Sequence, residues 1–320
     1  MSPLFERLGV KYPIIQGGMA WVAEAHLVAA VSAAGGLGVI GSGHAPADYV
    51  RTQIRAVKAQ TDRPFGVNVM LLSPHVEEVI QVIEEEHVAV VTTGAGDPAR
   101  YVPRLRAAGS LILPVVPSVA LAKRMVRSGV DGIIAEGMES GGHIGSLTTM
   151  ALVPQVVDAV DLPVIAAGGI ADGRGIAAAM MLGASGVQMG TRFLSAQETQ
   201  IHPNYKNAVL KAKDVDTLVT GLYVGHAARV LKNPMSRAYL KMERQIAISG
   251  TDDYAGVEEL GNGALRRAVQ EGDNEHGSFM AGQVAGMVDH VQPAAAIVDE
   301  VAQQANQLLM NSPVASAWLQ

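Results

Sequence analysis

The chain has 320 residues, of which 49% are hydrophobic and 17% charged, and its formal net charge is −6. This length can bury a large core, and the excess of negative charge argues against nucleic-acid binding. The sequence contains no cysteine, which excludes disulfides, thiolate metal sites, iron–sulfur clusters and cysteine nucleophiles. No apolar run approaches the roughly 18 residues that span a bilayer, and the amino terminus lacks a signal-peptide core. We therefore expect a soluble cytoplasmic protein with no membrane partner.

Short apolar runs alternate with helical patterns over most of the chain, and the runs are continuous, as in parallel strands covered on both faces. Strands are expected at residues 12–16, 36–40, 65–69, 88–91, 111–115, 132–135, 163–167 and 185–189. Helices are expected at residues 23–34, 47–60, 75–86, 98–108, 119–128, 147–160 and 174–182. This repetition predicts an α/β protein with a TIM (β/α)8 barrel. A doubly wound open sheet is the competing architecture, although it usually has fewer units.

The alternation breaks after Phe193. Residues 195–277 combine polar helical patterns with few buried-strand signals, so we expect an inserted, mainly helical lobe after the eighth strand. This lobe would act as a lid or substrate lobe over a barrel made of residues 1–194 and 278–320. A helical pattern starting in residues 279–284 is the candidate for the eighth barrel helix, and residues 294–309 are expected to form a final surface helix.

The most informative stretch follows the sixth strand and reads Ala-Glu-Gly-Met-Glu-Ser-Gly-Gly-His-Ile-Gly, residues 135–145. Its glycines would let a flat ligand lie against the backbone. His143 is the side chain in its Gly-Gly-His-Ile-Gly core that can exchange protons near neutral pH, so it is the candidate catalytic residue. The alternative is a glycine-rich turn whose histidine only caps a helix.

Other glycine and polar residues also follow the strands, and in a barrel these positions meet at the active-site face. The turns Gly168–Gly169 and Gly190–Thr191, after strands seven and eight, are where barrels commonly hold a phosphate. A phosphorylated planar cofactor such as FMN fits this arrangement, although two tight turns without a ligand are the simpler alternative. Asn68 and the backbone at Gln16 or Met19 could hydrogen-bond the ring.

Other familiar catalytic patterns are absent from the sequence. There is no Gly-x-Ser-x-Gly elbow, Walker loop or His-Glu-x-x-His motif, and we predict no metal site. Most of the remaining histidines have no ligand-like companions. His226, in the expected lobe, is a candidate to face the site. Arg229, Lys232 and Arg237 stand in a basic stretch of an otherwise acidic chain, where they could form a polar helix face or dock an acidic partner.

Several stretches closely resemble the FMN-dependent enoyl-[acyl-carrier-protein] reductase II family, within the nitronate monooxygenase (2-nitropropane dioxygenase) superfamily. They are residues 17–22, 64–73, 91–96, 114–123, 135–145, 166–172, 189–193, 202–206 and 280–283. The Gly-Gly-His-x-Gly motif marks the superfamily alone. The stretches Phe-Gly-Val-Asn-Val-Met-Leu-Leu-Ser-Pro and Pro-Val-Val-Pro-Ser point to the reductase branch.

The resemblance implies a barrel with tightly bound FMN, reduced by NADH or NADPH, and hydride transfer to the β carbon of a trans-2-enoyl thioester. It also implies a bacterial enzyme of fatty-acid elongation, acyl carrier protein as partner, a homodimer and a possible monovalent cation without assignable ligands. His143 would protonate the α carbon or hold the thioester oxygen. A helix N-terminus near residues 278–282 could balance the charge of the reduced flavin.

Fourteen residues make up the expected cofactor-binding set. They are Gln16, Gly17, Gly18, Met19, Asn68, Glu136, Gly141, Gly142, Gly168, Gly169, Gly190, Thr191, Met280 and Gln283.

Two other functions are compatible with the same glycine turns and His143. A nitronate monooxygenase would oxidise alkyl nitronates with oxygen, and a non-catalytic barrel would only bind a flavin or another phosphate-bearing ligand.

Overall fold

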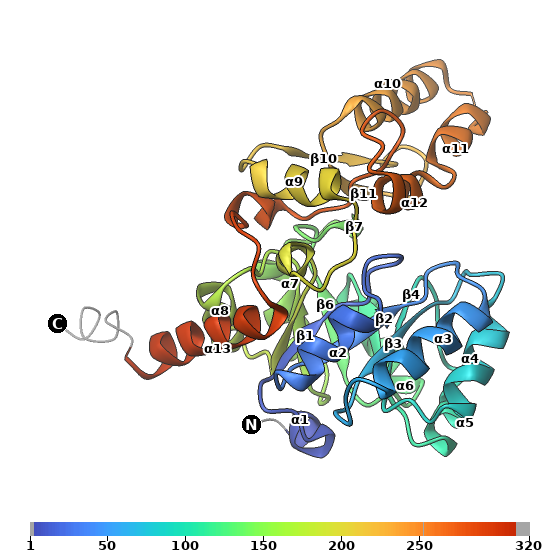
Figure 1. The fold of residues 1–320 in the computed structure, drawn as a ribbon. Coiled ribbons are helices and arrows are strands. Elements are labelled where there is room, and N and C mark those ends of the chain that lie inside the picture. Colours follow the sequence, from blue (N-terminus) through green and yellow to red (C-terminus); the bar gives the residue numbers. More distant parts are fainter. Residues whose placement is uncertain (1–2, 252, 312–320) are drawn as a thin grey trace.

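The chain folds around a closed barrel of parallel strands in the order β1-β2-β3-β4-β5-β6-β8-β9 (Figure 1). The structure is a computed structural model that describes residues 3–251 and 253–311. The barrel strands are β1 (Ile14–Gln16), β2 (Leu37–Gly41), β3 (Gly66–Met70), β4 (Val90–Gly94), β5 (Leu111–Val116), β6 (Ile133–Glu136), β8 (Val164–Ala167) and β9 (Gly186–Met189). The predicted TIM barrel is confirmed, and the strand ends differ from the expected ones by a few residues.

The strands are apolar on both faces because both faces are covered. Val39 on β2 belongs to the cluster inside the barrel, whereas its neighbour Ile40 packs in the outer cluster under the helices. Successive strand residues point to opposite sides of a sheet. A continuous apolar run is therefore what this position in the fold requires.

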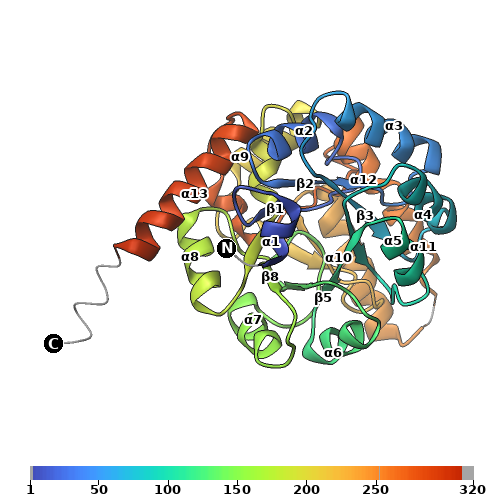
Figure 2. The same ribbon diagram turned by 90° about the horizontal axis from the view of Figure 1, so that it is seen from below.

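Helices surround the barrel, as the view from below shows (Figure 2). They are α2 (Ala25–Ala33), α3 (Ala47–Lys58), α4 (Val76–Glu85), α5 (Val102–Ala107), α6 (Val119–Arg127), α7 (Thr149–Val157), α8 (Gly173–Met181) and α13 (Ala294–Met310). Local signals set their ends. The Asp172 carboxylate accepts hydrogen bonds from N–H groups at the start of α8, and the Ser118 hydroxyl accepts one at the start of α6. Among residues 3–251 and 253–311, no helix is long and apolar enough to cross a membrane.

A short helix, α1 (Pro3–Leu8), closes the amino-terminal end of the barrel. Its Leu4, Phe5 and Leu8 side chains join the cluster inside the barrel. Gly186 leaves room for this plug, since a Cβ atom there would lie 2.5 Å from the Phe5 ring. The opposite, carboxyl-terminal end of the barrel is left for the site.

The prediction of the eighth barrel helix is wrong. Residues 279–284 form no α-helix; Met280 makes a β-bridge to Val230, and a short 3-10 helix, η3 (Gln283–Met287), follows. The expected surface helix α13 takes the barrel position instead, packed between α8 and α2. Phe279 is buried in the lobe, where its ring stacks on Tyr205 with centroids 4.8 Å apart. Because its apolar side chains are used there, this segment ties the lobe to the barrel.

The segment after β9 folds over the carboxyl-terminal end of the barrel (Figure 1). Its elements are η1 (Thr191–Ser195), α9 (Pro203–Lys211), β10 (Thr217–Thr220), β11 (Ala228–Leu231), α10 (Pro234–Ser249), α11 (Ala255–Gly261), α12 (Ala264–Arg266) and the π-helical turn η2 (Arg267–Glu271). Helices dominate, as expected, but β10 and β11 form an antiparallel sheet with β7 (Gly142–His143) from the barrel. The glycine–histidine loop is therefore the edge strand of the lobe's sheet, which the sequence analysis did not anticipate.

Candidate active site

A cavity of about 500 Å³ lies where the carboxyl ends of the barrel strands meet the lobe. Thirteen residues of the predicted site line it. They are Gly17, Gly18, Met19, Asn68, Glu136, Gly141, Gly142, His143, Gly168, Gly169, Gly190, Thr191 and Met280. The turns after the first, sixth, seventh and eighth barrel strands, with Asn68 of β3, thus share one cavity.

Two predicted site residues lie outside this cavity. Gln16 is fully buried, and its side-chain amide donates to the carbonyl of Gly17 and exchanges hydrogen bonds with the main chain of Val39. Its side chain joins β1 to β2 and does not reach the ligand space. Gln283 has an exposed side chain, and its main-chain N–H donates to the Glu139 carbonyl at 2.9 Å. Gln188, on β9, lines the cavity and was not among the predicted site residues.

The glycines provide room as well as unusual backbone angles. Gly168 and Gly169 have φ values of +89° and +70°, which favour glycine. A Cβ atom on Gly94 would meet nothing within 4 Å, and one on Gly190 would have only the Met19 side chain within that distance. Both would project into the cavity. These glycines leave main-chain groups accessible in the cavity, which suits a flat, phosphate-bearing ligand.

Asn68, in the middle of β3, is held by two neighbours. Its side-chain Nδ2 donates to Thr92 Oγ1 at 2.9 Å, which orients the amide. A Cβ atom on Gly18 would lie 2.3 Å from Asn68 Cβ, so only glycine lets this turn pack against it. Asn68 therefore presents a fixed amide to the cavity.

His143 belongs to β7 and pairs with Ala228 of β11. Its side chain is exposed at the cavity wall. The pKa of its imidazole is lowered, chiefly because surrounding protein desolvates the cationic form, and further by the nearby His226 and His44. A lowered pKa favours the neutral ring at pH 7, which has one N–H donor and one acceptor nitrogen. His226 does not line the cavity, but it acts on His143 through its charge.

Glu136 ends β6 at the floor of the cavity. Burial raises the pKa of its carboxyl group to about 7, against a smaller opposing effect of the Ser140 hydroxyl. A group with this pKa is protonated in part at neutral pH, as catalytic acids often are.

Glu139 fixes the glycine loop to the barrel. Its carboxylate accepts the main-chain N–H of Thr149, at 2.9 Å for the closer oxygen, and lies 2.9 Å from the Thr149 hydroxyl. The same hydroxyl lies 3.0 Å from the Gly168 carbonyl. The loop after β6 and the turn after β8 are thus held together at the start of α7.

Several lining residues escaped the sequence analysis, most clearly Trp21 and Arg266. Trp21 has φ of +64°, rare for a bulky side chain and frequent at functional sites. The Arg266 guanidinium, from the lobe, lies 5.1 Å from the centre of the Trp21 ring, and Tyr49 packs on that ring at 5.4 Å. This contact joins lobe and barrel at the cavity mouth. It brings together residues that are 245 positions apart (266 − 21), and no local sequence pattern predicts it.

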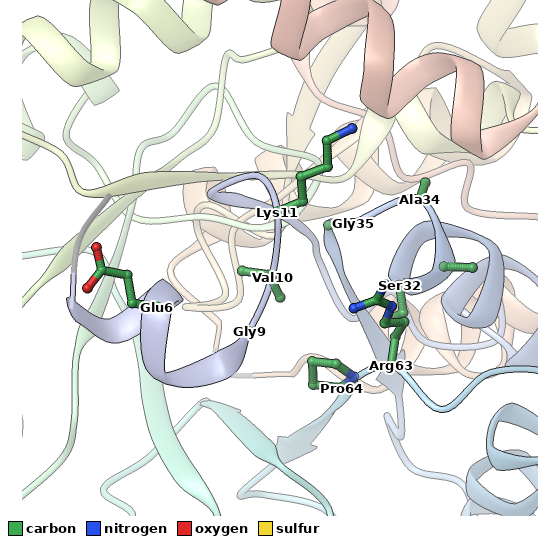
Figure 3. Close-up of a pocket in the computed structure, with 11 residues that line it drawn as sticks. Glu6, Gly9, Val10, Lys11, Ser32, Ala34, Gly35, Arg63 and Pro64 are labelled. Carbon is green, nitrogen blue, oxygen red and sulfur yellow. The ribbon is translucent and has the colours of Figure 1, made fainter.

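A second cavity, of about 490 Å³, lies at the amino-terminal end of the barrel beside α1 (Figure 3). It is lined by Lys11, Ser32, Arg63 and others that precede the strands. The Ser32 hydroxyl there already accepts the Gly38 N–H at 3.1 Å. Because active sites of such barrels lie at the other end of the strands, the first cavity is the candidate active site.

Comparison with known proteins places the chain in a family. Residues 1–80 and 75–304 match the family model described as nitronate monooxygenase. The chain belongs to the nitronate monooxygenase family. This is a family of oxidoreductases.

Within the nitronate monooxygenase family, three relatives are informative. FabK from Thermotoga maritima is a solved structure with 46% identity and a TM-score of 0.93, covering 99% of both chains. A probable nitronate monooxygenase from Staphylococcus saprophyticus is 34% identical, over 94% of this chain and 97% of its own. The (3aS,4S,5R,7aS)-5-hydroxy-7a-methyl-1-oxo-octahydro-1H-indene-4-carboxyl-CoA dehydrogenase of Mycobacterium tuberculosis is 33% identical, over 94% of each chain.

Proposed function

We propose that this protein is an FMN-dependent reductase that uses NADH or NADPH to reduce trans-2-enoyl thioesters of acyl carrier protein. The observation that carries the proposal is the position of His143, fixed by strand pairing at the wall of the glycine-lined cavity. The 46% identity to FabK, an enoyl-acyl carrier protein reductase II, supports the thioester substrate. So does the relative named as a carboxyl-CoA dehydrogenase, since its name describes another acyl thioester.

The cavity residues fit FMN. The Gly168–Gly169 and Gly190–Thr191 turns would hold the phosphate, Asn68 would bond the ring edge, and Met19 and Met280 would cover the ring. The space that Cβ atoms would fill at Gly94 and Gly190 is where a flat ring can approach the backbone. Bound FMN supplies a two-electron carrier between the pyridine nucleotide and the enoyl group.

His143 is placed to act on the thioester oxygen. Hydride addition at the β carbon puts negative charge on that oxygen, and a neutral imidazole N–H can donate a hydrogen bond to it. The lowered pKa of His143 supports this role over that of a cationic acid. The α carbon then needs a proton. Glu136, with a pKa of about 7, is a second group in the cavity that can hold one at neutral pH.

Nitronate monooxygenase activity is the second candidate, since the matched family and the Staphylococcus saprophyticus relative carry that name. In that reaction His143 would contact the nitronate, and oxygen would replace the enoyl thioester as oxidant. A barrel that binds its ligand without catalysis is the third. It differs from both because changing His143 would leave its function intact.

Product analysis separates these candidates. The FMN-loaded protein is incubated with NADH or NADPH and crotonyl thioester, and separately with a propyl nitronate in air. We expect butyryl thioester in the first reaction at a rate well above any nitronate turnover. Turnover of nitronate alone would replace the reductase proposal, and no turnover of either would favour the binding barrel.

We also propose that the acyl carrier protein docks on α10. Arg237, Lys241 and Arg244 are exposed there at spacings of four and three residues, which place them along one helix face. Acyl carrier protein is acidic, so the charges are complementary. The residues expected to dock the partner were Arg229, Lys232 and Arg237. Lys232 and Arg237 are exposed, but the expectation for Arg229 is wrong. Arg229 is buried on β11 and donates to the Met138 carbonyl at 3.0 Å.

A further inference from the structure

A carboxylate is buried in the lobe, away from the cavity lining. Glu243, on α10, has 0% relative exposure. Its Oε2 accepts the main-chain N–H of Gly221 at 2.6 Å. Its Oε1 has no hydrogen-bond partner within residues 3–251 and 253–311. Burying a carboxylate in this way costs free energy unless donors compensate, so the lobe retains a costly group at this position.

The bond from Glu243 reaches the turn between β10 and β11, residues 221–227. Gly221 has φ of +75°, and its carbonyl accepts the His226 N–H at 2.9 Å. A Cβ atom on Gly221 would lie 2.2 Å from the His226 carbonyl oxygen, so the two ends of the turn are in close contact. Fixing Gly221 therefore also fixes the main chain at His226.

The far end of the turn is attached to the strand that carries His143. The Ile144 N–H donates to the Ala227 carbonyl at 2.9 Å, and Ala228 pairs with His143 in the ladder. His226 precedes Ala228, the ladder partner of His143, by two residues. A chain of contacts thus runs from Glu243 through Gly221 and His226 to His143.

We propose that Glu243 is a positioning residue for the active site: by holding the 221–227 turn, it keeps His226 beside His143 and shapes the wall that the substrate meets. This inference rests on the proposed function only in assigning His143 a catalytic role. Glu243 itself does not line the cavity. Its own titratable and charged neighbours are Tyr239 and Arg244 on α10, and Glu258 on α11 acts on Tyr239.

The first test follows the His143 ring by nitrogen NMR in the FMN-loaded protein, between pH 5 and 8. Assignment uses the His143→Gln and His226→Ala variants. In Glu243→Ala, a released turn would move His226 away and admit more water around the His143 ring. Both changes favour the cationic ring, so the pKa of His143 should rise. Glu243→Gln keeps a side-chain acceptor for the Gly221 N–H and should retain the wild-type titration.

The second test is kinetic. In Glu243→Ala we expect the KM for crotonyl thioester to rise about tenfold, the size expected for one lost charge-assisted hydrogen bond. The rate at which NADH or NADPH reduces the flavin should stay unchanged. Combining Glu243→Ala with His226→Ala should add little to either single change, because both act through the same contact. Glu259→Ala, the same truncation at an exposed position of α11, is the matched control.

The proposal is overturned if folded Glu243→Ala keeps both the wild-type His143 titration and the wild-type KM. If that variant does not fold, Gly221→Ala disturbs the same turn from its other side and should raise the pKa of His143 likewise. An unchanged titration in this variant also rejects the idea. Should the protein lack reductase activity, the NMR titration still decides the role of Glu243, so its failure is distinguishable from that of the proposed function.

Discussion

At the residue scale, the cavity holds two titratable groups whose protonation is set by burial. His143 is kept neutral by a lowered pKa, whereas Glu136, with a pKa of about 7, retains a proton on part of the molecules at neutral pH. Enoyl reduction needs both a hydrogen-bond donor to the thioester oxygen and an acid that protonates the α carbon. Each assignment can be tested by a single substitution.

His143→Ala should keep FMN bound, since we propose that the glycine turns hold the cofactor. Enoyl-dependent turnover should fall about 100-fold, as for loss of one oxyanion donor. Flavin absorbance measures the first effect, and steady-state kinetics the second. His276→Ala, at an exposed lobe position, should change neither. Loss of flavin from the His143 variant would mean that the histidine supports the cofactor site and is not catalytic.

Glu136→Gln tests the raised pKa through stability. The folded pKa of about 7 exceeds the ordinary value of 4.5, so the protonated group is tolerated at low pH and stability is lost as pH rises through 7. Glutamine does not titrate, so the Glu136→Gln variant should not lose stability over this pH range. We expect the variant to be more stable than wild type at pH 8, on the order of 2 kcal/mol, and similar to it at pH 4.5. A pH-independent difference in denaturant unfolding would contradict the raised pKa.

The sequence predicts which residues line the cavity where the signal is local. Gly168 and Gly190 directly follow β8 and β9, His143 lies seven residues after the end of β6, and the barrel brings all strand ends to one face. It expects the backbone at Gln16 to reach the cofactor, whereas Gln16 does not line the cavity and its side chain bonds to Gly17 and Val39. It misses Trp21 and Arg266, because their contact depends on how the lobe packs against the barrel.

At the element scale, contacts between lobe and barrel decide the structure of two segments that local sequence patterns do not predict. The 279–284 segment has a helical pattern, but its apolar residues are used by the lobe, so tertiary packing overrides the pattern. The two-residue strand β7 has no period of its own and exists because β11 pairs with it. The glycine–histidine loop of the barrel and the sheet of the lobe are therefore joined in one sheet.

The basic face of α10 gives an element-scale prediction. Arg237→Glu with Lys241→Glu should raise the KM for enoyl-acyl carrier protein about tenfold and leave the KM for enoyl-CoA unchanged, since only the large partner reaches α10. The effect should shrink at high salt. Lys123→Glu with Arg127→Glu, two reversals on α6, is the control. An equal rise for both substrates would place the charges near the pocket and argue against docking.

At the scale of the whole molecule, α13 extends beyond the barrel (Figures 1 and 2). Leu308, Leu309 and Met310 near its end are exposed, with Met310 at 74%. We propose that this apolar end contributes to a homodimer, as expected from the family resemblance. Light scattering should give twice the mass of 33.4 kDa, and Leu309→Glu with Met310→Glu should shift it to the monomer. A wild-type monomer would refute the dimer, and an unshifted dimer would place its interface elsewhere.

We propose that the barrel holds a flavin, that the lobe covers it, and that the space between them receives an enoyl thioester. Anaerobic stopped-flow absorbance of the FMN-loaded protein tests this most directly. We predict that NADH or NADPH bleaches the flavin, that crotonyl thioester restores its colour, and that the second step slows about 100-fold in His143→Ala. If a nitronate reduces the flavin while neither pyridine nucleotide does, the reductase account is contradicted.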